Sequence, residues 1–246
     1  MDPDTGRAVS ELRGVRSVWF DLDDTLYDFQ VMMRQALLAP LRRIHEDYPH
    51  TRASLGVEEM VRVREEVSEG AGSLGLSLEQ MRLQAFRETL ARYAEPDDRL
   101  ADELQQMYLA ARFRDVAPFP DVRPCLAALK DRHLLGLLSN GNTMPEQLGL
   151  ERAFRFFVFS EQVGVRKPDR RIFRHAAALA DCAPQECIYV GDRPEDDVMG
   201  AVRAGWHAVW LNRSSKPWPL VSHEPYLQIR NLTQLPDLLP NPSTPG

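Results

Sequence analysis

The sequence has no long apolar run, no apolar N-terminal segment and no closely paired cysteines. None of its apolar runs approaches the ~18 residues that a membrane-spanning helix needs. Its first residues, MDPDTGRAVSELRG, contain nothing like the apolar centre of a signal peptide. Its three cysteines lack a C-x-x-C spacing, which disfavours a structural disulfide or a zinc site. We therefore expect a cytoplasmic protein without a membrane partner.

An excess of positive charge is also missing. The chain of 246 residues carries 30 Lys and Arg against 36 Asp and Glu, a formal net charge of −6. Nucleic-acid-binding proteins usually show a basic surface, so we expect no nucleic-acid partner. Hydrophobic residues make up 43% of the chain and charged residues 27%, as in ordinary globular proteins. The length is enough for one large domain, or for a core with a smaller insert.

Two kinds of hydrophobic periodicity divide the chain. Residues 29–115 show helical spacing throughout, which indicates four main helices. Residues 15–28 and 116–246 instead alternate apolar, strand-like runs with helical segments, as in a parallel sheet that is covered on both faces. The polar termini, 1–14 and 241–246, are expected to be poorly ordered.

These patterns predict an α/β fold: a Rossmann-like three-layer core with a parallel sheet, and an inserted helical domain. The insert enters between the first and second strands, and a capping box at Ser77-Leu78-Glu79-Gln80 begins one of its helices. A helix is expected from about Pro194 to Ala204, and Asn231 is expected to cap a final helix. The expected strands are Arg16–Leu22, Leu134–Leu138, Phe156–Phe159, Cys187–Val190, Ala208–Leu211 and Tyr226–Ile229.

Polar residues with catalytic chemistry follow four of these strands. In an open α/β sheet the ligand site lies outside the carboxyl ends of the strands. The first strand leads into Asp21 and Asp23, which are two residues apart and therefore point to the same side. The later strands are followed by Ser139, Asn140 and Gly141, then by Lys167, and then by Asp192, Asp196 and Asp197.

Such a set of side chains suits phosphoryl chemistry. Crowded carboxylates raise one another's pKa unless a cation keeps them ionised. Mg²⁺ prefers oxygen ligands and is usually held by one or two carboxylates, substrate phosphate and water. A metal ion and a lysine together would offset the negative charge of a phosphate-like substrate that binds beside these carboxylates. A nucleophilic carboxylate beside a second carboxylate that acts as acid and base would complete a covalent phosphoryl-transfer site.

The four motifs, in this order, resemble those of the haloacid dehalogenase-like hydrolase superfamily. The first is D-x-D-x-T, Asp21 to Thr25, and the second is Ser139 followed by Asn140-Gly141. The third is Lys167-Pro168, and the fourth is Gly191-Asp192 with the downstream stretch 197-DVMGAVRAGW-206. The helical insert is similar in position to the C1-type cap of this superfamily.

The resemblance implies a role for each matching residue. Asp21 would attack phosphorus, and Asp23 would protonate the leaving oxygen and then activate water. Ser139 and Lys167 would complete the catalytic set by binding the phosphoryl group and neutralising its charge. The residues expected around the phosphate are Asp24, Thr25, Asn140 and Gly141, with Asp24 acting through its backbone and Thr25 steadying the loop.

Magnesium is the cofactor that the resemblance implies. Its expected ligands are Asp21, the main-chain carbonyl of Asp23, Asp192 and a downstream acid that acts directly or through water. Asp196 and Asp197 compete for this last position. Asp197 agrees better with the superfamily pattern that follows it.

The resemblance favours one chemistry without excluding others. Dehalogenases of the superfamily typically lack an Asp at the position of Asp23, so a phosphatase of a small phosphorylated metabolite is preferred. A nucleoside monophosphate or a sugar phosphate is the expected substrate, and the chain is expected to be a monomer or homodimer. The alternatives are a phosphomutase, a 2-haloacid dehalogenase and a non-enzymatic binding protein on this fold.

The helical block carries arginines but no motif that identifies a substrate. Most are expected on a solvated face with partners at i,i+4, although one or two could bind a substrate anion. They include Arg34, Arg42, Arg43, Arg62 and Arg64.

Overall fold

The computed structural model divides the protein into two compact units. The core unit comprises Met1–Asp28 and Ala117–Gly246, and the helical unit comprises Phe29–Val116. The described residues are 12–71, 75–114, 116–220 and 227–239, so most of the termini predicted to be poorly ordered lies outside them.

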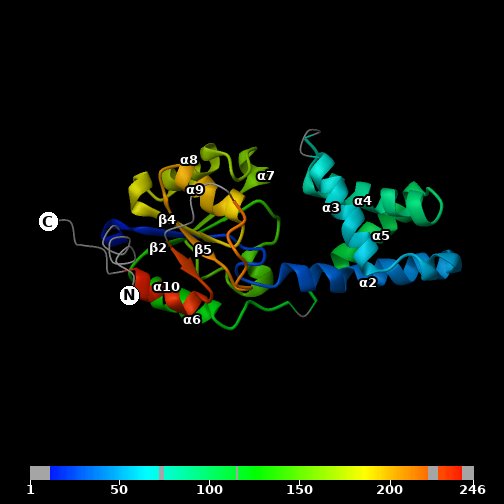
Figure 1. Ribbon diagram of the computed structural model, residues 1–246, viewed down its shortest axis with the longest axis horizontal. Helices are drawn as coiled ribbons and strands as arrows, with labels where there is room; N and C mark the ends of the chain where they lie inside the picture. Colours follow the sequence, from blue (N-terminus) through cyan, green and yellow to red (C-terminus); the bar gives the residue numbers. More distant parts are fainter. Residues whose placement is uncertain (1–11, 72–74, 115, 221–226, 240–246) are drawn as a thin grey trace. The chain divides into compact units, whose positions relative to one another are not determined.

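The core unit is built on a six-stranded parallel sheet with the order β3-β2-β1-β4-β5-β6 (Figure 1). The first strand lies inside the sheet, between β2 and β4, so the strand order reverses beside it. This arrangement confirms the predicted parallel α/β fold. The strands are β1 (Ser17–Phe20), β2 (Leu134–Ser139), β3 (Phe156–Phe159), β4 (Cys187–Gly191), β5 (His207–Leu211) and β6 (Gln228–Ile229).

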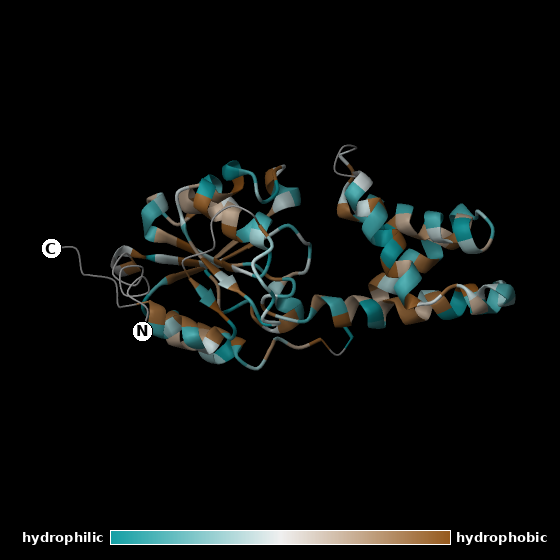
Figure 2. Cartoon of the chain, in the orientation of Figure 1, coloured by the Kyte–Doolittle hydropathy of each residue, from teal (hydrophilic) through white to brown (hydrophobic). Residues whose placement is uncertain are grey.

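Helices cover both faces of the sheet. On one face lie α8 (Arg170–Leu179) and α9 (Gly200–Arg203), and on the other lie α6 (Val122–Leu129) and α10 (Leu235–Leu238) (Figure 1). The strands are predominantly hydrophobic, while the helices carry hydrophilic residues as well (Figure 2). Sheets that are buried on both faces have nearly continuous apolar strands because neither face meets water.

The strand β1 is anchored by aromatic packing on the α8–α9 side. Trp19 contacts Phe156 and Trp206, while Phe173 of α8 packs edge-on against Tyr189 of β4. Gly136 of β2 pairs with Trp19, and a Cβ atom at Gly136 would collide with the indole ring. The packing therefore fixes the strand whose end carries Asp21.

The helical unit contains the four predicted main helices. A capping box at Ser77 begins α4: the backbone N–H of Gln80 donates to the Ser77 hydroxyl, and the Gln80 side chain accepts from the Ser77 backbone. The unit lies in the chain between β1 and β2, as predicted. Its helices are α2 (Phe29–Asp47), α3 (Val57–Ala71), α4 (Leu78–Tyr93) and α5 (Asp98–Ala111).

Three local predictions differ from the structure. The segment after β4 begins as a π-helical turn, Pro194–Met199, before continuing as α9. The sixth strand covers only Gln228–Ile229, and Tyr226 lies outside the described residues. Asn231 caps a 3-10 turn, Leu232–Gln234, which precedes the short α10. The π turn is wider than an α turn, and Asp197 within it accepts from the backbone N–H of Arg193, the residue just before the turn. Hydrophobic periodicity does not predict such a turn.

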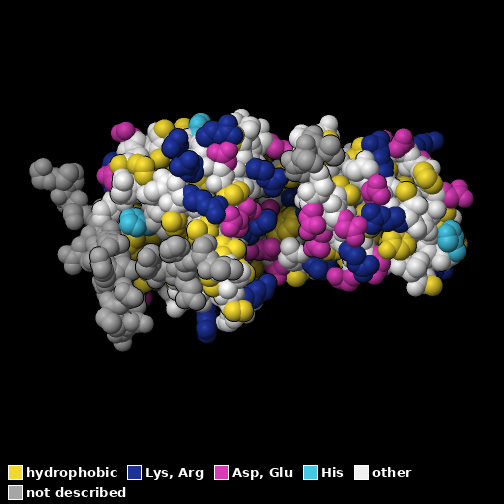
Figure 3. All heavy atoms as spheres, turned by 45° about the horizontal axis from the view of Figure 1, so that its top comes forward, with side chains coloured by type: hydrophobic (Ala, Val, Ile, Leu, Met, Phe, Trp, Pro, Cys, Tyr) yellow, Lys and Arg dark blue, Asp and Glu magenta, His cyan; other side chains and the backbone are white. Residues whose placement is uncertain are grey.

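The structure also provides observations on membrane-spanning helices, cysteines and surface charge. Within the described ranges, no helix combines the length and the apolar character required to cross a membrane. All three cysteines are free thiols. On the face drawn in Figure 3, basic and acidic side chains are interspersed over each unit, so neither sign of charge forms a large field of its own there.

Candidate active site

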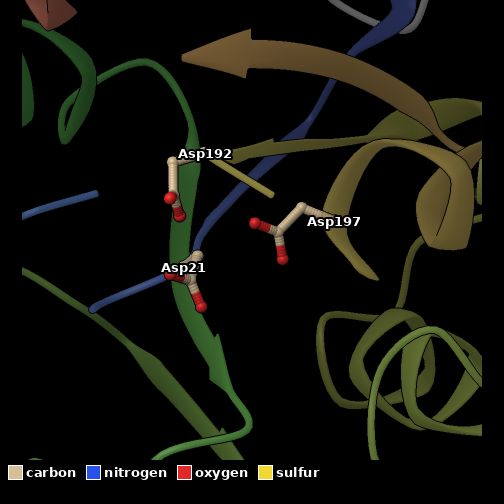
Figure 4. Close-up of side chains that lie close together, drawn as sticks. All are labelled: Asp21, Asp192 and Asp197. Atoms are coloured by element: carbon tan, nitrogen blue, oxygen red, sulfur yellow. The ribbon is translucent and has the colours of Figure 1, made fainter. Parts of the chain in front are cut away.

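Three aspartates meet at the carboxyl ends of β1 and β4. Asp21 follows β1 and donates its backbone N–H to Val190 of β4, while Asp192 follows β4 and Asp197 lies in the π turn. One carboxylate oxygen from each aspartate lies within 4.8 Å of the other two (Figure 4). Asp21 and Asp197 are buried, and Asp192 is partly buried. The sheet thus concentrates three acids at the point where the strand order reverses.

Lys167 is buried against two of these acids. Its Nζ donates to Asp21 Oδ1 at 2.6 Å, to Asp197 Oδ1 at 2.7 Å and to the Tyr189 hydroxyl at 2.7 Å. Tyr189 in turn donates to the backbone carbonyl of Leu138 at 2.6 Å. All three ammonium protons therefore have acceptors. These hydrogen bonds hold the lysine in place and replace the water that it lacks, since only 3% of its surface is exposed.

The charge of this cluster is unbalanced. Burial raises the pKa of Asp21 to about 7, with Lys167 opposing the shift and Asp197 adding to it. Burial and the neighbouring carboxylates Asp197 and Asp21 raise the pKa of Asp192 to about 8. Burial would lower the pKa of Lys167, but Asp197 and Asp21 raise it above its usual value. One ammonium thus faces three acids, and a further cation is what would keep all three ionised.

Asp23 is held by a separate hydrogen-bond network. The Tyr27 hydroxyl donates to Asp23 Oδ1 at 2.6 Å and lies 2.8 Å from Thr143 Oγ1. A Cβ atom at Gly141 would lie 2.5 Å from Asp23 Oδ2. The second carboxylate of the D-x-D motif therefore sits against the loop after β2, where only a residue without a side chain leaves it room.

The loop after β2 contributes a buried hydroxyl and an amide side chain that holds the Lys167 backbone. Ser139 is buried, and its Oγ accepts from the backbone N–H of Gly141 at 2.9 Å. Asn140 uses both polar atoms of its side chain on the backbone of Lys167, accepting from its N–H at 2.8 Å and donating to its carbonyl at 3.0 Å. The Asn140 side chain thus positions Lys167, and the predicted contact of Asn140 with phosphate stays a prediction.

The residues after Asp23 shape the loop. Asp24 has a positive φ of 60°, a backbone conformation that short polar residues such as Asp adopt more readily than most others. The buried Thr25 donates its hydroxyl to Asp192 Oδ1 at 3.3 Å. This bond joins the first motif to the fourth, so Thr25 orients an acid of the cluster. Its predicted contact with phosphate stays a prediction.

The structure distinguishes the two downstream acids. Asp197 accepts from Lys167 and, through Oδ2, from the backbone N–H of Arg193 at 2.9 Å. Asp196 pairs instead with the Arg193 side chain at 3.1 Å. Asp197, and not Asp196, joins the acidic cluster.

Sequence reasoning missed several residues around the site. Tyr189 has the sequence context of a core residue, and nothing local indicates that its hydroxyl reaches Lys167. Arg213 follows β5 and forms a bidentate ion pair with Asp121 at 2.8 and 3.1 Å, while donating to the Thr25 carbonyl at 3.0 Å. It thereby fixes the loop of the first motif. Thr143, the partner of Tyr27, was also missed.

Comparison with known proteins agrees with this geometry. Residues 15–205 match the family described as haloacid dehalogenase-like hydrolase. The chain belongs to this family. The four motifs lie within the matched region, and the six-stranded sheet with its inserted helices is the fold of the family's solved members.

Curated relatives of this hydrolase include phosphatases. Glyceraldehyde 3-phosphate phosphatase of Methanopyrus kandleri is 32% identical over 205 residues, which cover 81% of this chain and 84% of the relative. N-acylneuraminate-9-phosphatase of Mus musculus is 27% identical over 236 residues, with 93% and 95% covered. A solved structure, 2-haloacid dehalogenase from Pseudomonas syringae pv. Tomato DC3000, is 33% identical with a TM-score of 0.73, covering 92% of this chain and 98% of that one.

Proposed function

We propose that this hydrolase is a Mg²⁺-dependent phosphatase that cleaves phosphomonoesters of a small metabolite through an aspartyl-phosphate. One observation carries the proposal: Asp21 lies in an acidic cluster with Lys167, and the second carboxylate of its motif, Asp23, is held separately by Tyr27. A nucleophile and an acid–base group are thus distinct carboxylates with distinct partners. This division of roles is what double displacement at phosphorus requires.

The donor set suits magnesium. Asp21, Asp192 and the backbone carbonyl of Asp23 would hold the ion, and Asp197 would act on it directly or through water. Oxygen donors are the ligands that Mg²⁺ prefers. Burial, together with the neighbouring carboxylates, raises the pKa values of Asp21 and Asp192, and a bound cation would oppose this shift. When bound, the ion would neutralise phosphate charge and keep the carboxylates ionised.

In the first half-reaction, an Asp21 oxygen attacks phosphorus and the bond from phosphorus to the ester oxygen breaks. Asp23 gives its proton to the departing oxygen, so an alcohol leaves. Lys167 holds Asp21 in place and offsets the charge of the transferred group. Ser139 Oγ and the backbone N–H groups of the D-x-D loop lie at the strand ends to bind the phosphoryl oxygens.

In the second half-reaction, Asp23 takes a proton from water as the water oxygen attacks phosphorus. The bond between phosphorus and the Asp21 oxygen breaks, and inorganic phosphate leaves. Asp21 is regenerated as a carboxylate and Asp23 as an acid, so the cycle closes. The hydrogen bond from Tyr27 fixes the Asp23 carboxyl for both proton transfers.

The similarity to a 2-haloacid dehalogenase raises a competing reaction. Displacement of halide from carbon would need the Asp21 nucleophile but neither an acid to protonate an alkoxide nor a metal to hold phosphate. Here Asp23 is present and oriented by Tyr27, and Asp192 joins Asp21 in the cluster. These residues favour phosphate esters, as do the curated phosphatase relatives.

The substrate class rests on chemistry and on the relatives together. The two phosphatases above are named for different phosphorylated metabolites, so the relatives support a small organic phosphate without selecting one. A sugar phosphate or a nucleoside monophosphate is our proposal. A cytoplasmic location and a monomeric or homodimeric state stay predictions.

A screen of phosphomonoesters with and without Mg²⁺ tests the proposal. We expect release of inorganic phosphate that requires Mg²⁺ and is abolished by Asp21→Asn and by Asp23→Asn. Transfer of the phosphoryl group to a second hydroxyl of a sugar would indicate a mutase instead. Halide release from a 2-haloacid in the presence of EDTA, without phosphatase activity, would overturn the proposal.

A further inference from the structure

Tyr189 places a hydroxyl in the apolar interior of the core unit. It lies in the middle of β4, and none of its surface is exposed. Its ring packs edge-on against Phe173 of α8, with the ring centroids 5.4 Å apart. A phenylalanine would make the same ring contact without burying a hydroxyl, which needs hydrogen-bond partners wherever water is excluded. Packing alone therefore does not account for the hydroxyl.

The Tyr189 hydroxyl connects β4, the end of β2 and Lys167. It reaches across β1, which lies between β4 and β2, and donates to the Leu138 carbonyl at 2.6 Å, one residue before Ser139. It also accepts from Lys167 Nζ at 2.7 Å. Because its one proton is used on Leu138, only its lone pairs face the ammonium group. The hydroxyl is thus fixed as an acceptor for Lys167.

Lys167 has three ammonium protons and uses each of them on a different group. Asp21 and Asp197 accept two of them at 2.6 and 2.7 Å, and Tyr189 accepts the third. The Asp197 carboxylate has room beside β4 because Gly191 carries no side chain, and a Cβ atom there would collide with it. A neutral partner therefore takes the third proton, although the cluster contains a third acid.

Asp192 is that third acid, and no ion pair joins it to a described residue. One of its carboxylate oxygens lies within 4.8 Å of oxygens of Asp21 and Asp197 (Figure 4). Within the described ranges, its carboxylate accepts one hydrogen bond, from the neutral Thr25 hydroxyl at 3.3 Å. The cluster thus directs its ammonium group to two acids and leaves the third to another cation.

We propose that Tyr189 is a positioning residue for the metal site. By accepting the third proton of Lys167, its hydroxyl keeps the ammonium group away from Asp192 and leaves that carboxylate open to a divalent cation. Without the hydroxyl, this proton would turn to Asp192, because a buried ammonium proton without an acceptor is costly. The cation would then have to displace a charge-assisted hydrogen bond before it could bind. This inference rests on the Mg²⁺ site of the proposed phosphatase.

Tyr189→Phe removes the hydroxyl and keeps the ring against Phe173. Titration calorimetry of the full chain with Mg²⁺, in the absence of substrate, measures the Kd of the metal. We expect the variant to bind Mg²⁺ about tenfold more weakly, because hydrogen bonds to charged groups are the stronger ones. An unchanged Kd, in a variant that keeps a cooperative thermal transition, would overturn the proposal.

Trp206→Phe is the matched control for the packing of the core. Trp206 is buried, packs against Phe173 as Tyr189 does, and its indole N–H has no partner among the residues that the structure describes. The substitution removes part of an aromatic ring but no hydrogen bond, so the Kd for Mg²⁺ should stay unchanged. A loss of affinity as large as that in Tyr189→Phe would show that packing is responsible, and would contradict the proposal.

A double-mutant cycle tests whether Tyr189 acts through Lys167. In Lys167→Met no ammonium group can turn to Asp192, so adding Tyr189→Phe should leave the Kd for Mg²⁺ unchanged. If the tenfold loss persists in the Lys167→Met background, Tyr189 does not act through Lys167 and the proposal fails. If Lys167→Met does not fold, the comparison of Tyr189→Phe with Trp206→Phe still decides.

Phosphate release separates this inference from the proposed function. Mg²⁺-dependent hydrolysis, with an equal Kd for the native chain and Tyr189→Phe, would refute the role of Tyr189 and leave the proposed function intact. Mg²⁺ binding that is weakened in Tyr189→Phe, without hydrolysis of any phosphomonoester by the native chain, would support the role of Tyr189 and refute the phosphatase. We expect hydrolysis by the native chain, and about tenfold more Mg²⁺ for half-maximal activity in Tyr189→Phe.

Discussion

Replacing Asp192 by Asn is predicted to make the metal-free protein more stable at alkaline pH. Burial raises the pKa of Asp192 from 3.8 to about 8. Between these pH values, the folded protein therefore retains a proton on Asp192 that the unfolded chain has released. A carboxyl with a raised folded pKa contributes most below its unfolded pKa, and this stability is lost as pH rises toward the folded value. The amide side chain of the Asp192→Asn variant would not titrate, so this loss disappears.

The magnitude follows from the pH interval. Between about pH 5.5 and pH 8, one retained proton costs roughly 1.4 kcal/mol per pH unit, or roughly 3 kcal/mol in all. For a chain of this size, 1 kcal/mol corresponds to about 2 °C in Tm, so the effect is about 6 °C. Asp192→Asn should therefore gain about 6 °C relative to the native chain as pH rises over this interval without metal.

Scanning fluorimetry or calorimetry in EDTA measures this difference, followed by the same series in Mg²⁺. Mg²⁺ at a hundredfold excess over its Kd would stabilise the native chain by about 2.7 kcal/mol, and Asp192→Asn much less. Glu195→Gln is the control, because Glu195 is exposed and pairs with Arg203 in the same segment. If the Tm difference is independent of pH, or Mg²⁺ stabilises both proteins equally, the reasoning about the acidic cluster is wrong.

Three further variants test the residues that position the site. Tyr27→Phe should lower kcat about tenfold, because Asp23 loses the hydrogen bond that orients it. A cooperative thermal transition is the check on folding, and an unchanged kcat would contradict this role. Asn140→Ala removes two hydrogen bonds to the Lys167 backbone. It should lower the free energy of unfolding in urea by about 2 kcal/mol and also lower kcat. A variant with unchanged stability and full activity would show that Asn140 does not position Lys167. Arg213→Met breaks the ion pair with Asp121, and the free energy of unfolding in urea should fall by about 2–3 kcal/mol. A change below about 0.5 kcal/mol would show that the ion pair does not stabilise the fold.

The strand-end residues could be predicted from sequence because a parallel sheet brings the carboxyl ends of its strands to one edge. Asp21, Lys167 and Asp192 fall there for that reason, and the choice of Asp197 over Asp196 came from the pattern that follows it. The helical insert was visible in its change of periodicity. These features depend on local spacing and on fold geometry alone.

The supporting contacts could not be predicted, since their partners are remote in the chain. Arg213 reaches the Thr25 carbonyl across 188 positions, and Tyr189 reaches Lys167 from within an apolar strand. Asn140 was expected at the site, but its amide direction depends on the path of the Lys167 backbone. The π turn that delivers Asp197 likewise leaves no periodic signal. Such details depend on three-dimensional packing rather than on sequence pattern.

Trapping the covalent intermediate tests the central claim most directly. The protein is mixed with Mg²⁺ and a phosphomonoester identified by the screen, quenched in acid within one turnover, and digested for mass spectrometry. Our account predicts a peptide that carries the mass of one phosphoryl group on Asp21. In Asp23→Asn, any phosphorylated Asp21 that forms should persist longer, because the residue that activates water is missing. Rapid phosphate release with Asp21 never modified, or modification at a different residue, would contradict it.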